Sequence, residues 1–155
     1  MSARRVFIDT NLLLLLFVGT ASEAYIAAHR RTRAYTVDDF VLLKLLIADA
    51  AVFVTTPNVL AETSNLIRQF DRPRLTPILD VFRSFAAAAS ETYVRSAQGV
   101  GAADFERLGL NDVTILEAQE PDVTLITDDL NLYLTSATAG RKVLNFTHER
   151  ERVRG

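Results

Sequence analysis

Short apolar runs rich in β-branched and aromatic residues recur along the chain. They are separated by longer stretches in which apolar residues repeat every three or four positions. The short runs predict buried strands and the longer stretches predict helices. The expected strands cover residues 6–8, 52–56, 123–127 and 142–146, with 92–94 as a short edge strand. Strands that alternate with helices are typical of a parallel sheet with helices on both faces, so we expect an α/β fold, a three-layer α/β/α sandwich.

Helix start signals divide the longer stretches. Residues 20–23 and 36–39 have the pattern of a capping box, and Pro57 suits the first turn of a helix. The helix that follows Thr36 carries apolar residues on several faces, which predicts that it is heavily buried. Further helices are expected at about 75–89, from residue 112 to residue 121 and from residue 130, and Gly99 and Gly101 are expected to flank a loop.

The length of 155 residues and the hydrophobic content of 49% fit one domain with a sizeable core. We expect this domain to span residues 1–147, followed by a frayed basic tail at 148–155. The net charge of −2 gives no overall basic field, although an enzyme with a local basic rim is compatible with it. Two arginines before the first apolar run suggest a signal peptide, but Asp9 and Asn11 would interrupt its apolar core. A cytoplasmic protein without a membrane helix is therefore favoured.

The residue types limit the metal chemistry that is possible. The chain has no cysteine, which excludes disulfides, thiolate metal sites and cysteine nucleophiles. With His29 and His148 as its two histidines, a histidine-rich zinc site is disfavoured. Any metal ion would then be held by oxygen ligands, which points to Mg²⁺ or Mn²⁺.

Acidic residues follow the predicted strands. Asp9 ends the first strand, and the pair Asp128 and Asp129 ends the strand at 123–127. Glu62 lies in the early turns of the helix after the second strand, and Asp112 heads a later helix. The carboxyl ends of parallel strands share one edge of a sheet, where open α/β proteins bind their ligands. Carboxylates that converge there repel each other unless a divalent cation is bound, and such a cation is suited to phosphodiester hydrolysis.

Each acid also has a purely structural interpretation. Asp9, Asp112 and Asp128 could cap the helices that follow them, because aspartate is a good N-cap residue. Glu62 could favour the positive end of its helix, and Asp129 could simply be solvated. Four acids at the same edge of four separate elements are less expected by chance, which favours a shared site.

Four segments surround these acids: 7–13 (FIDTNLL), 55–62 (TTPNVLAE), 109–112 (GLND) and 125–129 (LITDD). In this order they resemble the four acidic motifs of the PIN-domain ribonucleases, and the resemblance covers nearly the whole chain. It implies a central parallel sheet of about five strands and metal-dependent cleavage of RNA. For a chain of this size it also implies a toxin of a toxin–antitoxin pair, similar to the VapC group, with an antitoxin or other protein as inhibitor.

By the same resemblance, the acids that hold the metal and carry out catalysis are expected to be Asp9, Glu62, Asp112 and Asp129. Thr10, Asn11 and Thr127 match polar neighbours that line the site in this family. Side chains alternate along a strand, so Asp128 should point away from Thr127 and Asp129. Whether Asp128 or Asp129 is the main fourth acid stays open.

Two further segments bear on partners. The densest basic group, His29, Arg30, Arg31 and Arg33, would suit an RNA backbone, or it would simply place cations at the negative end of a helix. Residues 23–48 are longer and more apolar than in the small toxins that the chain resembles. This predicts either a thicker core or a surface for a partner, such as a second copy in a homodimer.

Two other function classes stay open. The first is a PIN-like module that binds RNA or a protein without cutting. The second is a phosphoryl-transfer α/β domain, such as a receiver or a haloacid-dehalogenase-like phosphatase. Asn11 argues against the phosphatase, which has a second aspartate there, and Lys142 lies at the start of its strand, where a receiver lysine does not belong.

Overall fold

The computed structural model describes residues 4–155, so residues 1–3 of the expected domain lie outside the described range. Within this range a parallel sheet forms in the order β3-β2-β1-β4-β5. The strands are β1 (Arg4–Ile8), β2 (Ala50–Thr55), β3 (Ser90–Glu91), β4 (Val123–Thr127) and β5 (Val143–Asn145). The expected α/β fold with a five-stranded parallel sheet is confirmed.

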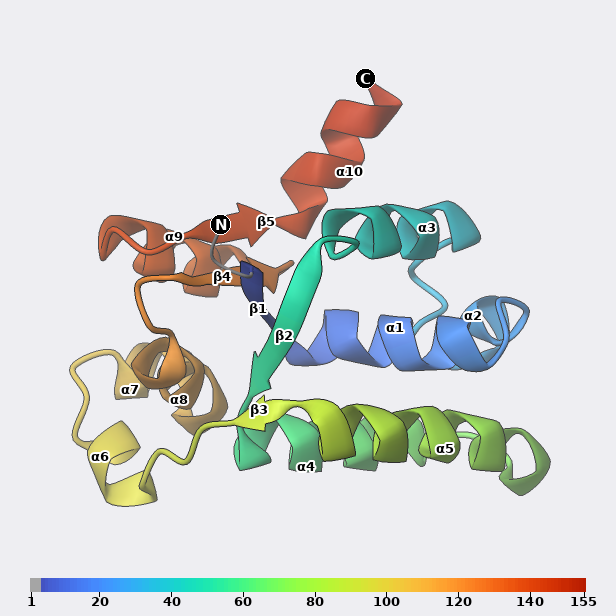
Figure 1. Ribbon diagram of the computed structural model, residues 1–155, viewed down its shortest axis with the longest axis horizontal. Helices are drawn as coiled ribbons and strands as arrows, with labels where there is room; N and C mark the ends of the chain where they lie inside the picture. Colours follow the sequence, from blue (N-terminus) through green and yellow to red (C-terminus); the bar gives the residue numbers. More distant parts are fainter. Residues whose placement is uncertain (1–3) are drawn as a thin grey trace.

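Helices cover the sheet on both sides (Figure 1). On one side lie α1 (Thr10–Ala21), α2 (Tyr25–Ala28), α3 (Val37–Leu46), α4 (Pro57–Ile67) and α5 (Arg72–Ala88). On the other side lie α6 (Ser96–Val100), α7 (Phe105–Leu108), α8 (Leu110–Ala118) and α9 (Leu130–Thr138). The last helix, α10 (Phe146–Arg154), projects from the body of the molecule and ends at the C-terminus.

The core is built on β1 and α1. In β1, Val6 and Phe7 are fully buried, as expected for a strand covered on both faces. In α1, the run from Leu12 to Leu15 is completely buried, and so are Phe17 and Val18. A helix that is apolar all round must be enclosed by other elements, and α3, α4 and α5 all pack against α1. This burial fixes the first turn of α1, and with it the acid that precedes the helix.

Most expected helix starts agree with the structure. The capping box at 36–39 is present, since the Thr36 hydroxyl accepts from the Asp39 amide and the Asp39 carboxylate accepts from the Thr36 amide. Pro57 opens α4 behind the N-cap Thr56. The capping box expected at 20–23 is wrong, because Thr20 still belongs to α1 and the short helix α2 has no side-chain cap.

Four expectations about local structure are corrected. The edge strand forms at Ser90–Glu91 instead of 92–94, and the glycine-flanked loop is partly the helix α6. The expected frayed tail at 148–155 is mostly helical, because Asn145 caps α10 through the His148 amide. The helix α3 is buried on one face only, since Val37, Val41 and Leu45 are 40%, 40% and 69% exposed.

None of the helices described for residues 4–155 has the length and apolar character needed to cross a lipid bilayer.

Candidate functional site

The candidate site lies where β1 and β4 end. The two strands run side by side, with Ile8 paired to Ile126, and the Asp9 amide continues the ladder by donating to the Ile126 carbonyl at 3.0 Å. Thr127 therefore stands next to Asp9, and its hydroxyl donates to Asp9 Oδ2 at 2.6 Å. The residues just before this edge, Val6–Ile8 in β1 and Leu125–Ile126 in β4, are apolar and buried, and polar residues follow them where the strands leave the sheet.

Asp9 is buried, with 6% of its surface exposed, and both of its oxygens are engaged. Besides the Thr127 bond, Oδ1 accepts from the Thr10 amide at 2.7 Å, so Asp9 also caps α1. The pKa of Asp9 is raised to about 6, because the effect of burial is larger than that of the two hydrogen bonds, which lower the pKa. The charges of Asp128 and Asp129 raise this pKa further. The structural interpretation of Asp9 as a cap is thus correct, and the charges of two other acids act on the same carboxylate.

Asp112 lies in the first turn of α8, behind Gly109, which has a φ of 86°. Such a backbone conformation favours glycine, and it turns the chain sharply into the helix. The pKa of Asp112 is raised to about 7, first by burial and then by the charges of Asp9, Asp129 and Glu62. The charges of three acids from other elements thus act on Asp112. That the four acids form one shared site stays a prediction.

Asp128 and Asp129 have separate partners. Asp129 caps α9, with Oδ1 accepting from the Leu132 amide at 3.0 Å, and its own amide donates to the Thr127 hydroxyl at 3.0 Å. The expectation that Asp128 could be the cap is wrong, because Asp129 has that position. Asp128 instead accepts a hydrogen bond from the phenol of Tyr35. Both acids nevertheless act on Asp9, whose pKa they raise.

Glu62, the remaining predicted acid, lies on α4. It is the sixth residue of α4, and its side chain is exposed. The Thr56 hydroxyl caps this helix by accepting from the Val59 amide at 3.2 Å, which directs α4 away from the end of β2. The charge of Glu62 contributes, as the smallest of the four causes, to the raised pKa of Asp112.

The chemistry of these side chains suits a hard divalent cation, although the arrangement is open. In residues 4–155, no group of three or more Asp, Glu or His side chains is arranged so that it could hold a metal ion. Mg²⁺ is commonly bound through one or two carboxylates and keeps several of its waters, so it does not require such a closed group. The donor chemistry, oxygen atoms alone, is the kind that Mg²⁺ or Mn²⁺ prefers, and one or two of these carboxylates, with Asp9 as the best fixed, would hold the ion.

The polar neighbours differ in their placement. Thr10 and Thr127 belong to the site, as their bonds to Asp9 show. Asn11 is exposed at the start of α1. The structure adds Asn111, which sequence reasoning missed: its Nδ2 donates to Thr10 Oγ1 at 3.3 Å. Among the described residues, Asn111 Oδ1 is a buried atom with no hydrogen-bond partner. The one feature of the sequence that could have indicated Asn111 is its position directly before Asp112.

The basic group does not border the acids. It follows α2, which lies at the opposite end of α1 from β1 (Figure 1), and α1 with its 12 residues is about 18 Å long. Arg31 donates to Gln69 Oε1 at 2.8 Å, just beyond the end of α4, while Arg30 and Arg33 are exposed. His29 is fully buried and bonds the Ile67 carbonyl at 3.1 Å, so it belongs to the core. Burial lowers the pKa of this histidine.

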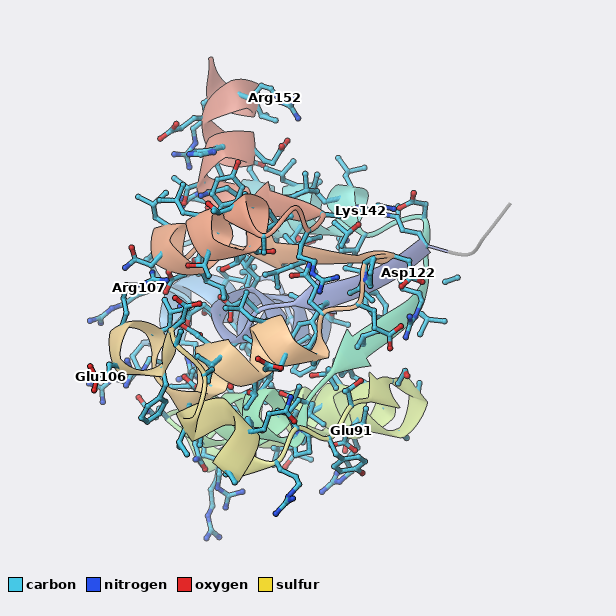
Figure 2. The ribbon with its side chains drawn as sticks, turned by 90° about the vertical axis from the view of Figure 1, so that its left-hand side faces the viewer. Glu91, Glu106, Arg107, Asp122, Lys142 and Arg152 are labelled. Carbon is cyan, nitrogen blue, oxygen red and sulfur yellow. The ribbon has the colours of Figure 1, made fainter. Side chains whose placement is uncertain are left out.

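Lys142 lies at the wrong end of the sheet for phosphoryl transfer of the receiver type. Figure 2 shows Lys142 and Asp122 at the end where β4 and β5 begin, and Arg107 at the opposite end. The acids follow β1 and β4, so they lie at the end far from Lys142. Arg107 bonds Asp104 and the Thr135 hydroxyl on α9, at 2.7 and 2.8 Å.

A separate apolar cavity of about 620 Å³ lies between α1, α3, β2 and α5. Its lining includes Phe17, Phe53 and Phe85, and Lys44 is the charged residue at its margin. An apolar surface of this kind does not suit phosphate or a divalent cation, so the acid group is the stronger candidate for chemistry.

Comparison of the sequence with models of protein families and with curated proteins finds no match in either case. The resemblance to the PIN-domain ribonucleases therefore stays a prediction from the four acidic motifs.

Proposed function

We propose that the protein is a metal-dependent endoribonuclease of the PIN type, which hydrolyses phosphodiester bonds in RNA with Mg²⁺ or Mn²⁺. The observation that supports this most is the electrostatic group at the carboxyl edge of the sheet. Asp9 and Asp112 come from elements about 100 residues apart, yet the charge of one raises the pKa of the other. A divalent cation bound among them would convert this mutual repulsion into attraction.

Each residue has a defined part in the proposed reaction. A bound divalent ion supplies positive charge that polarises the phosphate and stabilises the leaving oxygen. Asp9 is held in one orientation by Thr127 and Thr10, which makes it the fixed ligand of the group. Asp112, Asp129 and Glu62 provide the remaining negative charge from three other elements. In this proposal Asn11, which is exposed at the start of α1, contacts the RNA.

Replacement of Asp9 by asparagine tests this proposal. Asparagine preserves the shape and the acceptor oxygen of the cap but removes the charge, so cleavage should fall by at least about 100-fold while the protein stays folded. The measurement is Mn²⁺-dependent cleavage of a mixed RNA panel that includes transfer RNAs, with and without chelator. Asp122→Asn is the matched control, since Asp122 is an exposed acid at the other end of the sheet. Cleavage by Asp9→Asn at the control's rate would contradict the proposal.

A second candidate function is a PIN-like module that binds RNA or protein without cutting. It is favoured by the open arrangement of the acids among the described residues, and by the capping roles of Asp9 and Asp129. Such a module would retain RNA in a filter-binding assay in the presence of chelator, and the Asp9→Asn variant would retain it equally well.

The partners in this proposal are an RNA substrate, an antitoxin or other protein inhibitor, and a second copy of the chain. The proposed setting is the cytoplasm. Within the apolar segment 23–48, the large apolar side chains that are exposed are Val37, Val41 and Leu45 of α3. They are spaced four residues apart and form one stripe along the helix, which supports self-association through this face.

A further inference from the structure

A hydrogen bond links the loop before α3 to the end of β4. The phenol of Tyr35 donates to Oδ2 of Asp128, across 93 positions of the sequence. Asp128 directly follows Thr127, whose hydroxyl binds Asp9. Tyr35 is therefore one side chain removed from the residue that follows the Asp9–Thr127 hydrogen bond.

The ring of Tyr35 is held in place by α10. The Phe146 ring lies 6.3 Å from the Tyr35 ring, centroid to centroid, and the Arg150 guanidinium carbon lies 5.5 Å from the Tyr35 centroid. Arg150 is itself fixed, because its Nε donates to Asp39 at 2.9 Å. The Asp39 side chain is 4% exposed and also accepts from the Thr36 amide, so this ion pair is anchored in the capping box of α3.

The hydrogen bond from Tyr35 orients the carboxylate of Asp128. Its Oδ2 is taken by the phenol, which sets the orientation of the whole carboxylate and directs Oδ1 elsewhere. A carboxylate that is hydrogen-bonded through one oxygen is pre-oriented to offer the other to a cation. Asp128 is also the residue next to Thr127 in the chain, and the Thr127 hydroxyl holds Asp9, so the oriented carboxylate lies at the same strand end as Asp9.

We propose that Tyr35 is a positioning residue, which fixes Asp128 so that its second oxygen contributes to the divalent-cation site built on Asp9. This role rests on the proposed function. The ion pair of Arg150 with Asp39 holds Arg150 against the ring of Tyr35, so α10 contributes to the positioning of Asp128. Loss of a side chain that orients a metal ligand commonly weakens metal binding by about 10- to 100-fold.

The test is Mn²⁺ binding to the full chain, measured by titration calorimetry. Tyr35→Phe removes the phenol oxygen alone and should weaken binding by about 10-fold or more. Asp128→Asn should weaken it at least as much, and the double variant should bind no more weakly than Asp128→Asn, because Tyr35 acts through Asp128. Arg150→Gln, which loosens the Tyr35 ring but leaves its hydroxyl, should give a smaller loss in the same direction.

Tyr133→Phe is the matched control. Tyr133 lies on the neighbouring helix α9 against His148, and within residues 4–155 its hydroxyl donates to no carboxylate. A merely structural role of Tyr35 would lower the melting temperature and leave the Mn²⁺ affinity equal to that of the control, which would overturn the inference. A double variant that binds more weakly than Asp128→Asn would also overturn it. A wild-type protein that binds no Mn²⁺ through Asp9 would overturn the proposed function itself, and this role with it.

Discussion

At the scale of single residues, Asp9 combines a structural and a chemical task. Its carboxylate is buried, caps a helix and accepts a hydroxyl hydrogen bond, all of which fix its position. The same burial, together with the neighbouring acids, raises its pKa to about 6. Strong perturbation of carboxylates in one place is typical of functional sites, because a purely structural cap has no need of further acids around it.

The hydroxyl of Thr127 should contribute measurably to stability. It donates to Asp9 and accepts from the Asp129 amide, and a hydrogen bond to a charged group contributes about 1.5–3 kcal/mol. Thr127→Val should therefore lower the free energy of unfolding by about 1–3 kcal/mol in urea at pH 8 with chelator. Thr124→Val, the same change in the same strand, is the control, and an equal loss in both variants would show that the bond to Asp9 contributes nothing.

The metal-free protein should lose stability as the pH rises from about 4 to about 7. Asp9 and Asp112 have folded-state pKa values of about 6 and about 7, above the ordinary value of 3.8, so the folded state holds more protons than the unfolded state in this range. Their contribution to stability is complete below about pH 4 and decreases with increasing pH. Urea unfolding in chelator should show this slope, and Asp112→Asn should make it shallower. A slope unchanged from that of wild type would contradict the burial of charge at Asp112.

At the scale of elements, the close contact of α1 with α3 decides how well the site is supported. Gly19 of α1 faces the buried ring of Phe40 on α3, and a Cβ atom at Gly19 would lie 2.5–2.8 Å from three ring atoms. The two helices can approach this closely because the position has no side chain. The tight packing holds α1 in place, and the first turn of α1 holds Asp9.

Substitution of Gly19 by valine should destabilise the fold. The buried ring of Phe40 would have to shift away from the new side chain, and overpacking of this kind costs about 1–3 kcal/mol. Gly101→Val is the control, because at that exposed site the nearest atom to the new Cβ lies at 3.4 Å. The measurement is urea unfolding, and equal midpoints for the two variants would show that the packing of α1 on α3 is not tight.

At the scale of the whole molecule, the fold was predictable because its strands are short apolar runs between amphipathic or apolar helices. The edge strand β3 was misplaced, since a strand of two residues leaves little pattern. The place of Asp9 and of the pair Asp128 and Asp129 was predictable because these acids directly follow two parallel strands that end at the same edge of the sheet. Their detailed partners were not, because contacts such as Tyr35 with Asp128 join distant positions without any local signal.

The positions of the basic residues relative to the acids were also not predictable from the sequence. A run of arginines in the sequence indicated a rim for RNA, but α1 separates that run from the acids by its full length. Arg107, at the acidic end of the sheet, stands alone in the sequence and gave no such signal (Figure 2). A high density of charged residues along the sequence does not show which of them border a site. The path of the folded chain decides which residues come together.

The central claim is that these acids form one divalent-cation site, and the most direct test is the melting temperature with and without Mn²⁺. At about 100 times the dissociation constant, Mn²⁺ should stabilise the wild-type protein by about 2.7 kcal/mol. This corresponds to a rise of roughly 5–10 °C for a domain of this size. Asp122→Asn should show the same rise. Asp9→Asn should show little rise, and a metal-free melting temperature at or above that of wild type, because repulsion is relieved. A rise in Asp9→Asn equal to that of wild type, or no rise in any of the three proteins, would contradict the account.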